Sequence, residues 1–148
     1  MSPYHGETNL IEADKEAAAG KGWYFLLDPV TSHPAERILG KALVVSGVVF
    51  VTSFAPSDDL CGGGGESRLY AFDYINAVVD PEDQKILDTI DHKRFITIGS
   101  GVPSEPVYYF NPTTKKPSIL IQKSTSEITK ADPKLKERPM LIKSWKAR

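Results

Sequence analysis

The residue types most suited to catalysis or ligand binding lie close together in one stretch, between residues 55 and 66. It contains a lone cysteine, three acids and a glycine run: Cys61, Asp58, Asp59, Glu66 and Gly62–Gly65. Ca²⁺ takes about six to eight oxygen ligands, so three acids supply only part of a calcium site. A glycine run binds phosphate when a helix follows it, usually with Lys-Ser or Lys-Thr, whereas a strand-like sequence follows here. We therefore interpret this stretch as a flexible, solvated connection between strands.

The other candidate nucleophiles and bases lack partners at a useful spacing. His5, His33 and His92 are far apart and share no metal-ligand spacing. Cys61 is the only cysteine, so it is either a buried or reduced thiol, or it pairs with a cysteine of a segment outside this sequence. Ser100 lies between two glycines but lacks the Gly-x-Ser-x-Gly elbow. The sequence therefore predicts no enzyme activity and no catalytic, cofactor-binding or metal-binding residue.

The composition is that of a globular domain whose charge is unevenly distributed. The chain has 148 residues, 41% of them hydrophobic, and a net charge of −1, which argues against a general nucleic-acid binder. Residues 1–114 carry 8 Lys and Arg against 16 Asp and Glu, whereas residues 115–148 carry 10 against 3. The basic part either lies against the acidic body or meets an acidic partner, such as a pilin or a surface polymer. No aromatic residue accompanies its lysines before Trp145, so single-stranded nucleic acid is not expected.

Neither a signal peptide nor a membrane span is visible. The N-terminus is polar, and the longest apolar runs, such as Ala42–Val45 and Val48–Val51, are too short to cross a bilayer. The chain is therefore either cytoplasmic or a mature or excised part of an exported protein.

The first half of the chain has the pattern of an antiparallel sheet. Four compact or β-branched runs predict strands, at residues 22–28, 41–46, 48–54 and 67–74. Gly47 separates the second run from the third and predicts a hairpin. The last run, Ser67–Asn76, has an apolar strand, an Asp and a polar turn, as at the end of a β-propeller blade. Residues 22–79 are thus expected to form one blade-like sheet.

One or two short helices are expected beside the strands. Residues 8–19 are rich in helix formers and lie in an N-terminal segment, residues 1–21. The second helix lies in an insert at residues 80–94, where Asp80 is the expected N-cap and Pro81 the first helical residue.

A second blade-like sheet is expected over residues 95–148. Strands are predicted at residues 95–98, 106–110, 118–122 and 139–146, with a polar loop at 123–139. The predicted fold is therefore mainly β: antiparallel sheets resembling two blades of a β-propeller, with one or two short helices. Seven aromatic residues are expected in the core: Trp23, Tyr24, Phe25, Phe50, Phe54, Tyr70 and Phe72.

Several short segments follow one another in a specific order over residues 20–148. They are Gly22–Tyr24, Glu36–Leu39, Val48–Phe54, Pro56–Asp58 with Cys61, Leu69–Asp73, Gly99–Ser104 and Ser144–Trp145. The series resembles the C-terminal β-propeller of PilY/PilC-type proteins, which are type IV pilus biogenesis factors and tip-associated adhesins. The resemblance implies a pilus-associated protein at the cell surface, with a large N-terminal region outside this sequence. The Arg-Gly-Asp tripeptide and the Asp-rich calcium loop of some members are absent, so integrin binding and calcium control are not carried over.

Three functions follow as hypotheses. The first is a non-enzymatic binding and assembly module in cell adhesion or pilus biogenesis, whose partner is a pilin, a minor pilin or the missing propeller segment. The second is a structural subunit that complements another chain in an extracellular filament or pilus complex. The third is a fragment of a quinoprotein-type propeller enzyme, which a partial propeller with one cysteine disfavours. Exposed strand edges would also allow a homo-oligomer.

Overall fold

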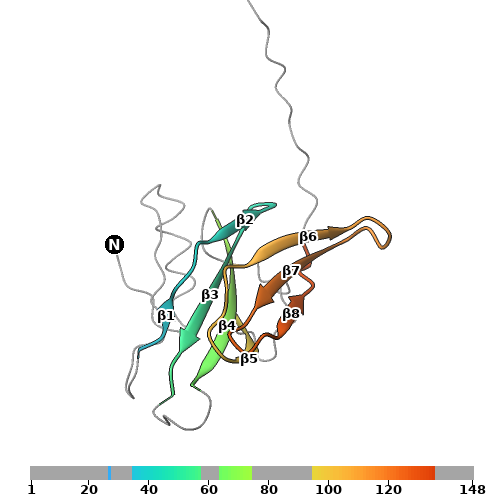
Figure 1. Cartoon of the computed structure of the whole chain (residues 1–148). Helices are drawn as coiled ribbons and strands as arrows, with labels where there is room; N and C mark the ends of the chain where they lie inside the picture. The colour runs from blue at the N-terminus through green and yellow to red at the C-terminus, as the bar shows by residue number, and fades with distance from the viewer. Residues whose placement is uncertain (1–26, 28–34, 58–63, 75–94, 136–148) are drawn as a thin grey trace, which may run out of the picture.

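The chain forms two antiparallel β-sheets (Figure 1). The computed structural model describes Leu27 and residues 35–57, 64–74 and 95–135. Eight strands and no helix lie in this described part, which confirms the mainly β class. The two predicted helices, at residues 8–19 and 80–94, fall outside it, as do the predicted strands at 139–146 and, except for Leu27, at 22–28.

The larger sheet has five strands in its described part. They are β1 (Arg37–Ile38), β2 (Leu43–Val45), β3 (Val48–Ala55), β4 (Glu66–Asp73) and β5 (Phe95–Ser100). The order is β1-β3-β4-β5, and β2 also pairs with β3. The predicted hairpin at Gly47 is confirmed, because Ser46 and Gly47 both have positive φ and join Val45 to its partner Val48. Two positive φ values are typical of the type I′ turn, whose twist suits a hairpin.

Strand β4 is an interior strand of the larger sheet. It lies between β3 and β5, and its apolar residues are buried on both faces of the sheet. Leu69 and Ala71 face the main hydrophobic core, whereas Tyr70 and Phe72 lie on the opposite face and are also buried. Burial on both faces explains why this strand is a continuous apolar run without alternation.

The smaller sheet contains β6 (Val107–Asn111), β7 (Lys116–Gln122) and β8 (Ile128–Ala131), in that order. Two features differ from expectation. Strand β8 lies inside the segment predicted as a polar loop, and it contributes the buried Ala131 to the core. Strand β5 pairs with β4, so the run beginning at Phe95 extends the larger sheet rather than joining the later strands.

The hydrophobic core lies between the two sheets. The larger sheet contributes Val48, Phe50, Leu69, Ala71 and Ile98, and the smaller sheet contributes Ile119, Ile121 and Ala131. Burying each of the Val, Leu, Ile and Phe side chains among them favours folding by about 1.5–3 kcal/mol relative to leaving it exposed. The expected core positions Phe50, Tyr70 and Phe72 are confirmed as buried, and Phe54 is half-buried.

Polar contacts at the segment between β5 and β6 also join the sheets. The Thr52 hydroxyl donates a hydrogen bond to the Ser104 carbonyl at 2.8 Å, and the Ser104 amide donates to the Gln122 carbonyl at 2.7 Å. The buried Lys123 ammonium donates to the Ile98 carbonyl at 2.9 Å and pairs with Glu127 at 2.7 Å. Hydrogen bonds from residues of both sheets therefore hold the segment 99–104 in place.

None of the residues that the structure describes belongs to a helix that is long and apolar enough to cross a lipid bilayer.

Candidate functional site

Most of the candidate residues singled out in the sequence lie outside the described residues. These are the three histidines, the cysteine, two of the loop acids and three aromatics: His5, His33, His92, Cys61, Asp58, Asp59, Trp23, Tyr24 and Phe25. Trp145 lies outside them too. Ser100 is exposed at the end of β5, and Glu66 begins β4. Within the described ranges, no group of three or more His, Cys, Asp or Glu side chains is placed to hold a metal ion.

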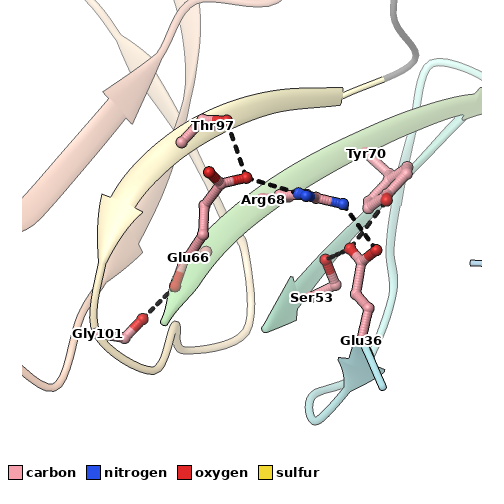
Figure 2. Close-up of polar contacts among 8 residues, drawn as sticks. Glu36, Ser53, Glu66, Arg68, Tyr70, Thr97 and Gly101 are labelled. Carbon is pink, nitrogen blue, oxygen red and sulfur yellow. Dashed lines mark hydrogen bonds and ion pairs between the residues drawn. The ribbon is translucent and has the colours of Figure 1, made fainter. Parts of the chain in front are cut away.

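The structure brings together a cluster of polar side chains that the sequence did not predict (Figure 2). The Glu36 carboxylate is its centre and accepts hydrogen bonds from three side chains. The Tyr70 hydroxyl donates at 2.8 Å, Arg68 Nη1 donates at 2.9 Å, and the Ser53 hydroxyl donates to the same oxygen as Tyr70. The Glu36 side chain is only 3% exposed, so these three donors replace the water that the carboxylate has lost.

The pleat of the sheet explains how these residues meet. Arg68 and Tyr70 are two residues apart on β4, so their side chains lie on the same face of the sheet. Ser53 on β3 is the cross-strand partner of Arg68, and therefore shares that face. Glu36 comes directly before β1, which pairs with the end of β3. This is the face of the larger sheet opposite the core with the smaller sheet.

Arg68 connects the Glu36 cluster to a second carboxylate. Its Nε donates to Glu66 Oε1 at 2.7 Å, and the Thr97 hydroxyl donates to the same oxygen at 3.3 Å. The guanidinium also lies over the ring of Phe95, with Cζ 4.6 Å from the ring centroid. A guanidinium in this position is stabilised by the negative face of the ring as well as by the two carboxylates.

The surroundings shift two pKa values in this cluster. Burial raises the pKa of the Tyr70 phenol, and the Glu36 carboxylate raises it further through its charge and its hydrogen bond. Burial alone would lower the pKa of Arg68, but hydrogen bonds to Glu66 and Tyr70 and the charge of Glu36 outweigh it and raise that pKa. Tyr70 is therefore held as a neutral donor and Arg68 as a cation.

The raised pKa of Tyr70 predicts a loss of stability at alkaline pH. An unfolded Tyr releases its proton near pH ~10, whereas folded Tyr70 still holds it there, so the unfolded state binds fewer protons. The contribution of Tyr70 is complete below that pH and is lost as pH rises toward its folded-state pKa. We expect the free energy of unfolding to fall by about 1 kcal/mol more between pH ~9 and ~11 in the wild type than in Tyr70→Phe. Urea denaturation at both pH values measures the difference, and equal losses would contradict the raised pKa.

The Glu36 cluster is suited to holding the fold rather than to chemistry. Ser53 is fully buried, Glu36 and Tyr70 are nearly so, and each makes the hydrogen bonds described above. A nucleophile or base needs contact with a substrate, which burial denies to these groups. Their arrangement instead fixes the segment before β1 to the sheet, because Glu36 is bonded to residues of both β3 and β4.

The surface of the smaller sheet carries a second unusual feature at β6. Four successive large apolar residues, Val107–Phe110, are each between 38% and 57% exposed. Strand β6 pairs only with β7 among the described strands, so its other side is an edge of the sheet. Strand β2 contacts β6, yet Val107 remains the most exposed of the four. An exposed apolar strand at a sheet edge is a ready template for pairing with another strand.

Local hydrogen bonds define the turn that follows β6. The Asn111 side-chain carbonyl accepts from the amides of Thr113 and Thr114, and its backbone carbonyl accepts from the Lys115 amide at 2.9 Å. These contacts form the turn that Asn favours and set β6 against β7. Figure 1 shows the β6–β7 hairpin projecting away from the rest of the two sheets. The exposed aromatic residues of β6, which are Tyr108, Tyr109 and Phe110, thus lie on a hairpin whose turn is held by these hydrogen bonds.

Of the two features, the β6 edge is the one accessible to another molecule.

When the chain was compared with models of protein families, with curated proteins and with solved structures, no match was found.

Proposed function

We propose that this chain is a non-enzymatic protein-binding and assembly module whose contact surface is the edge strand β6. The observation that carries the proposal is the exposure of Val107–Phe110 along an edge of the smaller sheet. Soluble proteins usually protect such edges with charges, prolines or a covering segment. Here the strand itself contains no charged residue, and its four apolar side chains are open to contact.

The chemistry of this edge suits a strand from another protein. An added strand would satisfy the backbone groups on the open side of β6, and the side chains would supply affinity. Tyr and Phe are enriched in protein interfaces because they bury a large area with few rotatable bonds. Tyr108, Tyr109 and Phe110 offer three such anchors in sequence.

In its more specific form, the module belongs to the end of a PilY-type β-propeller on a type IV pilus at the cell surface. The support for this form is the ordered series of segments that resembles that family, including Val48–Phe54 and Leu69–Asp73. These two segments lie in the neighbouring strands β3 and β4 of one antiparallel sheet, as adjacent strands of a blade would. The expected partners are then a pilin, a minor pilin or the rest of the propeller.

A second candidate function is a structural subunit that complements another chain in a filament. It is favoured by a further exposed apolar residue at the opposite end of the smaller sheet, Ile128 on β8, which is 65% exposed. A sheet that accepts strands at both ends can extend in two directions. Fibres in electron micrographs of the purified chain with its partner would favour this function over a one-to-one module.

Binding to pilins tests the proposed function directly. We expect immobilised chain to bind purified major or minor pilin in biolayer interferometry, and Val107→Lys to weaken that binding at least about tenfold, equivalent to ~1.4 kcal/mol. A lysine on an edge strand opposes strand addition because its charge would have to be buried or displaced.

The matched control is Ile38→Lys. Ile38 lies on β1 of the larger sheet and is 46% exposed, compared with 57% for Val107. This variant should bind as the wild type does. Absence of binding to every pilin would overturn the pilus form of the proposal, and equal losses in both variants would remove β6 as the contact surface.

A further inference from the structure

We infer that a second copy of this chain pairs with the β6 edge, antiparallel and about a two-fold axis at Tyr109. The inference rests on the proposed function, since it takes the same strand as the binding surface and names an occupant for it. Four observations carry it: the position of two prolines, the apolar side chains, the charges at the two ends of the strand, and the open edge itself.

The prolines define a symmetric pairing register. Strand β6 runs from Val107 to Asn111, with Pro106 directly before it and Pro112 directly after it. Proline has no amide hydrogen and cannot donate to a neighbouring strand. A pairing centred on Tyr109 would place Pro106 of each copy opposite Pro112 of the other. All five residues between the prolines could then pair, and no backbone hydrogen bond would require an amide hydrogen from a proline.

The same register places like side chains together. Tyr109 would lie opposite Tyr109 of the second copy, and Tyr108 opposite Phe110. Directly opposed aromatic residues in antiparallel strands attract each other. Because partners across a pair of strands share a face, Tyr109 would meet its counterpart on one face of the extended sheet, and the two Tyr108–Phe110 pairs would lie on the other.

The charges near the strand ends are complementary in this arrangement. Glu105 precedes the strand and is exposed, whereas the hairpin after it carries the exposed Lys115 and Lys116. An antiparallel pairing brings Glu105 of one copy beside the hairpin of the other, and the two-fold axis repeats the contact. The paired strands contain no charge, so no like charges are forced together. A parallel pairing would lack this match, because it sets acid beside acid and base beside base.

The expected complex is weak because the contact is small. Five residues from each copy form less than a standard interface, which buries about 1,600 Å² in total. We therefore expect a concentration-dependent dimer with a dissociation constant on the order of 10–100 μM, as for transient contacts. Such a dimer would yield its edge to a partner that binds more tightly.

The test uses charges placed on the proposed axis. The full chain is studied by sedimentation velocity at concentrations on both sides of the expected dissociation constant, alone and as variants. Tyr109→Lys and Tyr109→Glu should each weaken self-association at least about tenfold, because two like charges would face each other. A mixture of the two variants should form a one-to-one dimer, since opposite charges then meet. This mixture also shows that both variants are folded.

Ile128→Lys is the control, because it adds the same charge at the β8 end of the same sheet and should associate as the wild type does. The inference would be overturned if the wild type stayed monomeric or if Tyr109→Lys left the association unchanged. It would also be overturned if the mixture failed to pair or if Ile128→Lys weakened the association equally. If Val107→Lys weakens pilin binding but the chain does not self-associate, the proposed function stands and the inference fails. Self-association without pilin binding would support the inference and remove the pilus form of the function.

Discussion

Replacing Glu36 with alanine is expected to lower the free energy of unfolding by about 3 kcal/mol. The variant removes the one acceptor shared by Ser53, Arg68 and Tyr70. Breaking a buried ion pair from one side is costly because the remaining charge and donors stay buried without their partner. Arg68 retains Glu66, which keeps the loss at the lower end of the range for buried pairs. Chemical denaturation of both proteins at neutral pH measures the difference.

Glu66→Ala provides the matched control, since both carboxylates bind the same guanidinium. The Glu66 side chain is 45% exposed, compared with 3% for Glu36. Water can replace an exposed carboxylate, and exposed ion pairs contribute about 0–1 kcal/mol, so we expect a loss below ~1 kcal/mol. Adding Arg68→Met to Glu36→Ala should cost less than the sum of the single changes, with a coupling of at least ~1 kcal/mol. Equal losses for the two glutamates would show that Glu36 is not the centre of the cluster.

The strands were largely predictable where β-branched or aromatic residues run together. The runs at Leu43, Val48–Phe54 and Leu69–Phe72 give strands at the expected places, because such side chains suit a pleated, buried surface. Strand β8 was missed because Ile128–Ala131 contains only one large apolar residue, and that residue is exposed. Its pairing with β7 and the burial of Ala131 are tertiary effects that the local sequence does not carry.

The environment of a strand was less predictable than its presence. Leu69–Phe72 and Val107–Phe110 are both runs of four apolar residues, and both were predicted as strands. The first is buried on both faces of the interior strand β4, whereas the second is exposed on β6 at an edge of its sheet. Local sequence alone does not distinguish a central strand from an edge strand, since the difference depends on which strands lie beside it. For this reason, only the structure shows that the aromatic residues of β6 lie exposed at a sheet edge.

The Glu36 cluster was not predictable as a set, because its members come from three separate parts of the chain. One signal did point toward it. Ser53 lies inside the β-branched and aromatic run of β3, and a hydroxyl buried in such a strand needs a hydrogen-bond partner. The sequence does not show which acceptor meets that need, because the approach of Glu36 depends on the pairing of β1 with β3.

Gly65→Ala is expected to lower the free energy of unfolding by about 3 kcal/mol, from backbone strain of ~1–3 kcal/mol together with a steric clash. Gly65 has φ +119°, a conformation that residues with a side chain rarely adopt. An added Cβ would press on the carbonyl oxygen of Ala55 and lie 2.7 Å from Pro56 Cα and 2.9 Å from Phe54 Cζ. The first two are backbone atoms at the end of β3, so relief would require the strand end to move. Thermal and urea unfolding of the variant measure the loss.

Gly64→Ala separates the clash from the strain. Gly64 also has a positive φ, +90°, but an added Cβ there would meet nothing within 4 Å. This variant carries the cost of the backbone conformation alone, so we expect a loss of about 1–2 kcal/mol, clearly smaller than at Gly65. Equal losses would show that the close approach of β3 to Gly65 contributes nothing. A larger loss at Gly65 would mean that the glycine run, interpreted from sequence as a flexible connection, includes one position that the packing of β3 against β4 restricts to glycine.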